Sequence, residues 1–277
     1  MAHRHGPRAR LDTELVRRGL ARSREQAAQL IDGGRVLVGG HVARKAASGV
    51  HANDPIVLRD EGGDGPARQE YASRGGHKLA GALEAFDGLA VAGRHCLDAG
   101  ASTGGFTDVL LRAGAQHVVA VDVGYGQLAW AMRIDPRVTV LERTNVRSLT
   151  PEQIGQPPEV VVADLSFISL TLALTALVAC ARPDTDYVLL VKPQFEVGRD
   201  RVGEGGVVRD PALRAAAVRH VARHAATLGL GVLGIVASPL PGPAGNVEYF
   251  LWLRAGAPPL REEALQEAIE RGPRGAS

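Results

Sequence analysis

Apolar residues between about residues 71 and 254 occur in short continuous runs that alternate with longer segments of helical spacing. The runs predict strands at 95–97, 118–121, 138–141, 160–163, 187–191, 231–236 and 247–253. The segments between them predict helices at 107–113, 127–133, 170–181 and 212–228. Continuous apolar strands separated by helices predict a parallel, doubly wound α/β sheet. A loop with three prolines separates the last two strands, which are expected to pair antiparallel at the sheet edge.

The first sixty residues have the pattern of a separate small α+β domain. Leu11, Leu15 and Leu20 recur at helical spacing, and Ser23 is a suitable N-cap for a second helix that ends at Gly33 and Gly34. Short strands at 35–38 and 41–43 flank a glycine turn and predict a hairpin, followed by a strand at 56–59. The expected division is 1–60 for this domain, 61–70 for a linker, 71–255 for the α/β body and 256–277 for a charged tail with a short helix.

Composition excludes several classes of protein. The longest apolar stretch, 168–181, is too short for a membrane span, and two cysteines cannot form a disulfide scaffold. The nine histidines show no metal-ligand spacing, so no metal is expected. The start of the chain lacks the apolar region of a signal peptide, which favours the cytoplasm.

The basic residues are unevenly distributed. Residues 1–60 contain eleven Lys and Arg against six Asp and Glu, so this region favours an anionic partner. An RNA-binding surface is predicted there; a merely solvated surface is the alternative. Its candidate residues are Arg10, Arg18, Arg22, Arg24 and Lys45. The whole chain has only three lysines, Lys45, Lys78 and Lys192, which marks these as positions where arginine would not serve.

A glycine-rich segment follows the first strand of the body and opens a helix. It lacks both the G-x-G-x-x-G spacing of dinucleotide sites and the lysine of a P-loop. Asp98 would disfavour a pyrophosphate and favour a cationic ligand, while Asp122 is placed to accept bonds from ribose hydroxyls. An adenosyl ligand with a positive centre, such as S-adenosyl-L-methionine, fits this pattern; a purely structural glycine turn is the alternative. The predicted cofactor-binding residues are Asp98, Gly100, Ser102, Thr103, Gly104, Gly105, Phe106, Asp122, Asn145 and Asp164. Asn145 could equally cap a loop.

The segments 98–106 with Asp122, 163–167, 191–196 and 73–79 together resemble the TlyA-type (haemolysin-A-like) ribosomal RNA 2′-O-methyltransferases. The resemblance implies an S4-type RNA-binding domain followed by an FtsJ-like, Rossmann-like class I methyltransferase domain with a seven-stranded sheet. It also implies S-adenosyl-L-methionine as cofactor and ribosomal RNA or ribosomal subunits as partner, with cytidine as the target. The Arg-rich segment 3–10 resembles the members that act on both subunits. Oligomeric state stays open.

The family's Lys-Asp-Lys-Glu tetrad corresponds to Lys78, Asp164, Lys192 and Glu248. A ribose 2′-hydroxyl is a poor nucleophile, and Lys192 is the expected base, or the stabiliser of the developing alkoxide. Asp164 and Glu248 would orient the two lysines. Taken singly, each residue has a structural reading: Asp164 as a helix cap, Lys192 at a solvated strand end, Glu248 in a cross-strand pair and Lys78 on a helix surface.

Other readings remain open at this stage. An RNA-binding assembly factor with a silent methyltransferase body is the main alternative. A membrane-active toxin lacks a signal peptide or span, and a pseudouridine synthase would have no use for a methyl-donor loop. The glycine-rich loop 194–210 is expected either to close over RNA or to be an ordinary surface loop.

Overall fold

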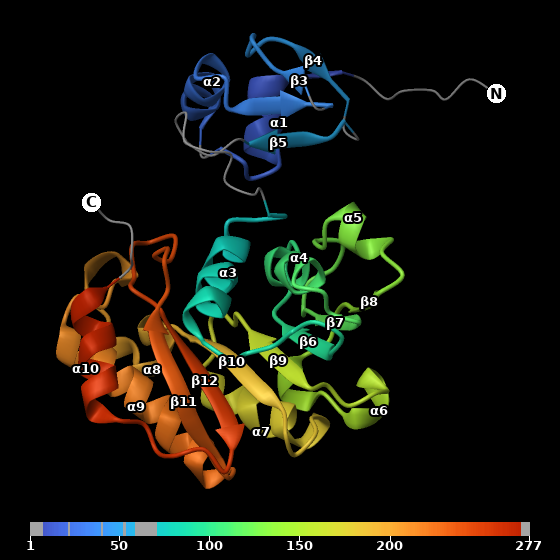
Figure 1. The fold of residues 1–277 in the computed structure, drawn as a ribbon. Coiled ribbons are helices and arrows are strands. Elements are labelled where there is room, and N and C mark those ends of the chain that lie inside the picture. The colour runs from blue at the N-terminus through green and yellow to red at the C-terminus, as the bar shows by residue number, and fades with distance from the viewer. Residues whose placement is uncertain (1–7, 22, 40, 52–53, 59–70, 273–277) are drawn as a thin grey trace. The chain divides into compact units, whose positions relative to one another are not determined.

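A computed structural model describes residues 8–21, 23–39, 41–51, 54–58 and 71–272 (Figure 1). Contacts divide the chain into two units, residues 1–69 and 70–277. The linker expected at 61–70 lies outside the described residues.

The first unit packs two helices against short strands. The helices are α1 (Leu11–Arg17) and α2 (Arg24–Asp32), and the Ser23 side chain accepts a hydrogen bond from the Gln26 N–H, as its N-cap role predicts. The core consists of the buried residues Leu11, Leu15, Ala21, Ala27, Ile31, Val36 and Val50. The strands are β1 (Ala9–Arg10) paired with β4 (Gly49–Val50), and a three-stranded sheet of β3 (His41–Val42), β2 (Val36–Val38) and β5 (Ile56–Leu58). The two helices and the hairpin are confirmed.

The second unit is built on one seven-stranded sheet of order β11-β12-β10-β9-β6-β7-β8. All seven predicted strands are present, and β12 is antiparallel to both of its neighbours, β10 and β11. The outer strand on that side is β11, with β12 inside it. The strands are β6 (His95–Ala99), β7 (His117–Val121), β8 (Val138–Leu141), β9 (Val160–Ala163), β10 (Asp186–Val191), β11 (Leu230–Ala237) and β12 (Tyr249–Ala255).

Helices cover both faces of this sheet because its strands are apolar on both sides (Figure 1). In β9, Val160 and Val162 join the core under α3 and α4, whereas Val161 and Ala163 join the core under α7 and α9. The α-helices are α3 (Gly75–Ala85), α4 (Gly105–Arg112), α5 (Trp130–Arg133), α6 (Pro151–Ile154), α7 (Leu170–Cys180), α8 (Pro193–Glu196), α9 (Pro211–Thr227) and α10 (Glu262–Arg271), with short 3-10 turns η1 (Val146–Ser148), η2 (Arg199–Arg201) and η3 (Glu204–Gly206).

Two helices differ from the expectation. The helix predicted at 127–133 is only the single turn α5, since the Ala129 N–H bonds to the Thr103 carbonyl and Leu128 is buried, which hold the preceding residues in a loop. The helix expected in the tail, α10, buries Leu265, Ala268 and Ile269 in the core that also includes α7 and α9. It is thus packed onto the body.

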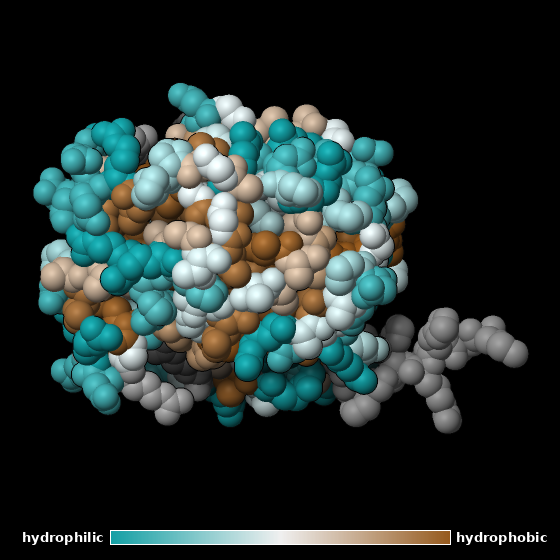
Figure 2. Space-filling view, turned by 90° about the horizontal axis from the view of Figure 1, so that it is seen from below, coloured by the Kyte–Doolittle hydropathy of each residue, from teal (hydrophilic) through white to brown (hydrophobic). Residues whose placement is uncertain are grey.

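Within the described residues, no helix has the length and apolar character to cross a membrane. On the face shown in Figure 2, hydrophobic residues lie in separate groups among hydrophilic ones. This is the usual surface of a folded domain, where apolar atoms remain partly exposed.

Candidate active site

The candidate catalytic residues converge on one edge of the sheet. Asp164 follows β9 and Lys192 follows β10, so both lie at the carboxyl ends of parallel strands. Glu248 precedes β12, which runs in the opposite direction, and the pairing of Val191 with Tyr249 brings it to the same edge. Open α/β sheets bind their ligands at this edge.

Four side chains form two short ion pairs there. Lys192 Nζ lies 2.6 Å from Asp164 Oδ1, and Lys78 Nζ lies 2.5 Å from Glu248 Oε2. Lys78, Lys192 and Glu248 are 5%, 8% and 1% exposed, whereas the Asp164 side chain keeps 22% of its surface accessible. Charges this deeply buried are costly even when paired, so stability alone does not account for the two pairs. The structure therefore brings the predicted tetrad together.

Helix α3 delivers Lys78 to this edge and lies close to Asp164. A Cβ atom at Gly75 would be 3.9 Å from Asp164 Oδ2. Arg74, just before the helix, donates from Nη2 to the Pro241 carbonyl at 2.8 Å, which ties the start of α3 to the loop before Glu248. The two ion pairs are thus parts of one cluster.

Sequence reasoning missed two polar neighbours of the tetrad. Lys192 Nζ also donates to Ser166 Oγ at 2.8 Å, and the Gln194 amide donates to Glu248 Oε1 at 3.4 Å. Both belong to segments that carried the family resemblance, two residues beyond Asp164 and Lys192 respectively. That spacing was the available signal. Ser166 is exposed, so the buried Lys192 ammonium is linked to solvent through one hydroxyl.

The glycine-rich loop has the backbone that its sequence requires. Gly100 and Gly104 have φ of +88° and +96°, in the left-handed region that favours glycine. A Cβ at Gly100 would lie 2.7 Å from the Asp164 carbonyl oxygen, and one at Gly105 would lie 2.3 Å from Ser73 Oγ. The loop therefore fits tightly between Asp164 and the start of α3.

Asp98 is the buried acid of this loop. It is fully buried; its Oδ2 accepts a hydrogen bond from the Thr107 hydroxyl at 2.7 Å, and its Oδ1 is buried without a protein partner. Burial raises the pKa of Asp98 from 3.8 to about 7, against the opposing Thr107 hydrogen bond. An unpaired buried carboxylate oxygen is a fitting acceptor for an ammonium group, such as the amino group of S-adenosyl-L-methionine.

Asp122 directly follows β7, as predicted, and its carboxylate already accepts two backbone hydrogen bonds. Its two carboxylate oxygens accept the N–H groups of Ser102 and Gly124 at 2.8 and 2.7 Å. Each oxygen has a second lone pair, so bonds to ribose hydroxyls remain available. Asp122, Ser102 and Gly124 line a shallow pocket with Ala101, Ala120, Gln127, Leu128, Val140 and Glu142.

The remaining predicted cofactor residues differ in placement. Phe106 is 3% exposed and packs against Phe250, so its side chain belongs to the core, and only its backbone is near the loop. Thr103 is exposed, and its carbonyl accepts the Ala129 N–H. Asn145 caps η1 by accepting the Arg147 N–H, which is the capping alternative; a contact with adenine stays a prediction.

Exposed Phe167 stands beside the tetrad. It is 88% exposed, has φ of +67°, and its ring centroid lies 5.4 Å from that of Phe195. A left-handed backbone costs free energy at a non-glycine residue, and residues strained in this way cluster at functional sites. Sequence reasoning included Phe167 only as part of a motif.

Loop 194–210 is held by hydrogen bonds to a buried asparagine that precedes β12. Asn246 is 2% exposed, accepts the Val208 N–H at 2.9 Å and donates to the Gly206 carbonyl at 2.8 Å. Because Asn246 lies two residues before Glu248, these bonds link the loop to the tetrad. Closure of the loop over RNA stays a prediction.

Four arginines of the first unit form ion pairs with two buried acids, Asp12 and Glu14. Asp12 pairs with Arg10 at 2.8 Å and Arg24 at 3.1 Å, and Glu14 pairs with Arg18 at 2.7 Å. Arg18 also donates to the carbonyls of Asp54 and His51, and its side chain is only 21% exposed, which assigns it a structural task. The hydrogen bond from Arg17 is the main cause that lowers the pKa of Glu14 to about 2.

Three other candidate RNA-binding side chains are accessible to solvent. The Arg10 and Arg24 side chains are 51% and 61% exposed, and Lys45 is exposed. Arg22 lies outside the described residues. RNA binding by this set stays a prediction.

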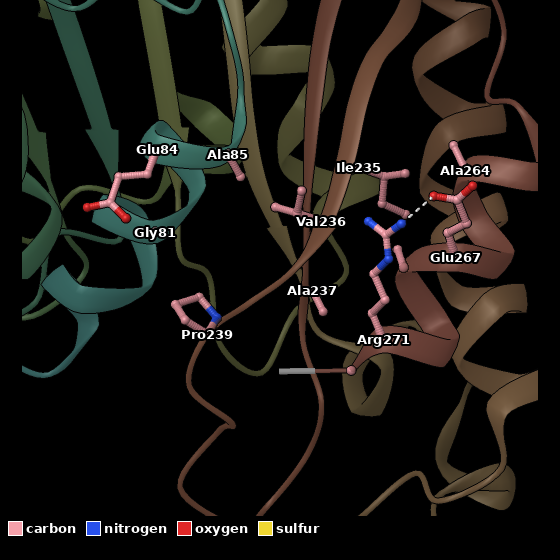
Figure 3. A pocket seen from close by; sticks show the side chains of 12 residues that line it. Gly81, Glu84, Ala85, Ile235, Val236, Ala237, Pro239, Ala264, Glu267 and Arg271 are labelled. Atoms are coloured by element: carbon pink, nitrogen blue, oxygen red, sulfur yellow. Dashed lines mark ion pairs between the residues drawn. The ribbon is translucent and has the colours of Figure 1, made fainter. Parts of the chain in front are cut away.

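A larger cavity of about 450 Å³ lies away from the tetrad, between α3, β11 and α10 (Figure 3). Figure 3 shows Glu84 on α3 and the ion pair of Arg271 with Glu267 on α10, which is 3.1 Å long. Its lining includes neither a tetrad residue nor a residue of the glycine loop. We therefore place the chemistry at the strand ends.

Comparison with known proteins also separates an N-terminal domain from a larger second domain. Residues 71–255 match the FtsJ-like methyltransferase family and residues 9–56 match the S4 domain. The chain is 60% identical to the 16S/23S rRNA (cytidine-2'-O)-methyltransferase TlyA of Mycobacterium tuberculosis over 96% of this chain and 99% of that one. Identity to the 23S rRNA (cytidine-2'-O)-methyltransferase TlyA of Campylobacter jejuni is 32%, over 86% and 96%.

A solved structure matches nearly the whole chain. It is a hemolysin-named protein from Streptococcus thermophilus, 36% identical, with a TM-score of 0.77 over 96% of this chain and 95% of that chain. The match covers both units and is well above the identity at which only a fold is shared. The chain therefore belongs to the FtsJ-like methyltransferases, in the group whose members carry an N-terminal S4 domain.

Proposed function

We propose that this protein transfers a methyl group from S-adenosyl-L-methionine to the ribose 2′-hydroxyl of cytidine in ribosomal RNA. The observation that carries the proposal is the pair of buried lysine–carboxylate contacts at the carboxyl edge of the sheet, beside the glycine loop. The high identity to a relative named for this reaction supports it.

The chain's residues fit the cofactor. Asp98 Oδ1 would hold the amino group, and Asp122 the ribose hydroxyls. Gly100 and Gly104 adopt the left-handed backbone that shapes the loop beside these acids, where another residue would be strained. When bound, the cofactor supplies a methyl group already activated by its positive sulfur.

Lys192 is the group that we assign to the hydroxyl. Asp164 and Ser166 occupy two directions around Nζ, and an ammonium has three donors. The third can orient the 2′-oxygen and stabilise the negative charge that develops as the oxygen–carbon bond forms. The hydroxyl proton is released in that step. Asp164, the most exposed member of the tetrad, is the nearest carboxylate that can accept it and pass it to water.

Glu248 and Lys78 form the supporting pair. Gln194 contacts Glu248 Oε1, and a Cβ at Gly242 would lie 2.6 Å from the same oxygen. The carboxylate is therefore confined, and it holds the Lys78 ammonium in place through their ion pair. This fixes the electrostatic field around Lys192 before the RNA arrives.

Exposed Phe167 provides a surface for the target base. Proteins that recognise a specific RNA nucleotide commonly splay its base out of the stack, and an aromatic ring can replace the lost stacking. The cytoplasm is the expected location, where ribosomal subunits are the partner. We propose that both subunits are substrates, because the more similar of the two TlyA relatives is named for both rRNAs.

Lys192→Ala tests this assignment. Transfer of labelled methyl to unmethylated subunits should fall at least about 100-fold, since removal of one donor aimed at a developing negative charge typically costs about 10²–10³-fold. Lys192→Arg should not rescue it, because the planar guanidinium cannot occupy the site of a compact ammonium. Cofactor affinity should stay within a few-fold. Near-normal transfer by Lys192→Ala would remove Lys192 from the mechanism.

A further inference from the structure

The body exposes a group of large apolar side chains that the proposed reaction does not use. Tyr125, Trp130 and Ile134 are 69%, 72% and 59% exposed, and all three lie between β7 and β8. Ile134 and Trp130 are one helical turn apart, joined by the bond from the Ile134 N–H to the Trp130 carbonyl. We call these three residues, together with exposed Arg143, the aromatic face.

Glu142 holds the parts of this face together. Its Oε1 accepts the Gly126 N–H at 2.7 Å, next to Tyr125, and it pairs with Arg133 of α5. The loop and the helix turn therefore meet at one carboxylate. Because the charge of Glu142 is used inside the structure, the exposed charge of the aromatic face comes from Arg143.

Arg143 is held in a costly conformation. Its φ is +53°, and its guanidinium carbon lies 4.4 Å from the centroid of the Tyr125 ring. A left-handed backbone is unfavourable at a non-glycine residue and persists only where the surrounding structure holds it. This conformation presents a cation stacked on an exposed ring. Aromatic rings with arginine are the side chains that bind unpaired bases and their phosphates.

The position of the aromatic face points to the same ligand. The Ala129 N–H bonds to the Thr103 carbonyl, and a Cβ at Gly104 would lie 2.9 Å from Leu128. The segment that carries Trp130 is thus packed on the glycine loop, so a molecule bound to the aromatic face lies next to the methyl-donor site.

We propose that the aromatic face binds an unpaired nucleotide of the RNA substrate that flanks the target, with the base on Trp130 and Arg143 at its phosphate. This inference rests on the proposed function, which identifies the RNA as ribosomal RNA. It adds a recognition surface on the methyltransferase unit itself, separate from the S4 domain and from Phe167.

Tryptophan fluorescence tests the proposal directly, because the chain has only two tryptophans. Trp252 is 8% exposed and donates to Asp186, so Trp130 supplies the signal that responds to a surface ligand. Protein-free 23S rRNA transcript added to the full-length protein should quench this signal. The quenching should vanish in Trp130→Phe, which keeps a stacking ring and should keep near-normal RNA affinity.

Trp130→Ala should weaken binding of the same transcript by about 5- to 100-fold, the range expected for loss of one base–aromatic stack. Leu172→Ala, at an apolar side chain 52% exposed elsewhere on the same unit, is the matched control and should bind normally. Unchanged RNA affinity in Trp130→Ala, or equal quenching by S-adenosyl-L-methionine alone, would overturn the proposal. Quenching only by ribosomal proteins, and not by the transcript, would also overturn it.

These readouts do not require catalysis, which separates the two proposals. Quenching by RNA without any methyl transfer by the wild type would preserve the aromatic face and reject the proposed reaction. Normal methyl transfer together with normal RNA affinity in Trp130→Ala would reject the aromatic face and preserve the proposed reaction.

Discussion

At the scale of single residues, the chemistry depends on charges that the fold buries. Lys78 and Lys192, two of only three lysines in an arginine-rich chain, each contact a carboxylate within 2.6 Å. The family resemblance predicted this tetrad, and the lysine count agreed with two of its four members. Ser166 and Gln194 were not predicted, because only their positions two residues beyond Asp164 and Lys192 mark them, and a side-chain hydrogen bond leaves no periodic pattern in a sequence. Phe106 was predicted for the cofactor, but its apolar ring is in the core.

Asp98 predicts a pH-dependent stability. Its pKa in the folded chain is about 7, against 3.8 as the ordinary value, so the folded state favours the protonated acid. This contribution is present below about pH 4 and is lost as the pH rises to about 7. From pH 5 to about pH 7 the free energy of unfolding should therefore fall by about 3 kcal/mol more in the wild type than in Asp98→Asn, at about 1.4 kcal/mol per pH unit, with little further change up to pH 8.

Urea unfolding of both proteins without ligand, at pH 5 and pH 8, measures this difference. The Asn variant is the matched control, because it has nearly the same shape and cannot ionise. Parallel pH profiles for the two proteins would contradict the burial argument.

At the scale of elements, strand order and strand ends were predictable because buried parallel strands are continuous apolar runs. The antiparallel β12 was predicted from its short connection to β11, and it explains why Glu248 reaches the same edge as Lys192. Helices were less predictable. The shortening of α5 depends on a bond from Ala129 to the distant Thr103, and the packing of α10 on contacts with α9, neither of which is local in sequence.

Helix α10 therefore carries a stability prediction. Leu265 is fully buried in the core shared with α7 and α9, so Leu265→Ala should lower the free energy of unfolding by about 2–5 kcal/mol. Glu263→Ala on the same helix, at a side chain 76% exposed, is the control and should change it by less than about 0.5 kcal/mol. Denaturant unfolding checks both. Equal, small effects would mean that α10 is a dispensable tail.

At the scale of the whole molecule, two units divide the work: residues 70–277 hold the candidate chemistry and residues 1–69 include the S4 domain. The basic excess of the first sixty residues indicated RNA binding, but the buried Asp12 and Glu14 that hold its arginines were not anticipated. A count of charges cannot distinguish a cation that is free to contact RNA from one that forms an ion pair within the folded domain. Arg18 is of the second kind, while Lys45 stays exposed.

Deletion of residues 1–69 should weaken binding to ribosomal subunits and make its salt dependence shallower, because phosphate contacts release counterions in proportion to their number. Cofactor affinity should be unchanged, since the glycine loop lies in the other unit. Subunit binding measured from 50 to 200 mM salt checks this. An identical salt slope would mean that the phosphate contacts are made elsewhere.

The central claim is the reaction itself. Wild-type protein, labelled S-adenosyl-L-methionine and purified unmethylated 30S and 50S subunits should give label in the RNA of both subunits. The labelled riboses should resist alkaline hydrolysis at cytidine, because a 2′-O-methyl group blocks attack on the neighbouring phosphate. Label that enters a base, or subunit binding without any incorporation, would contradict the account; the latter would indicate an assembly factor with a silent methyltransferase body.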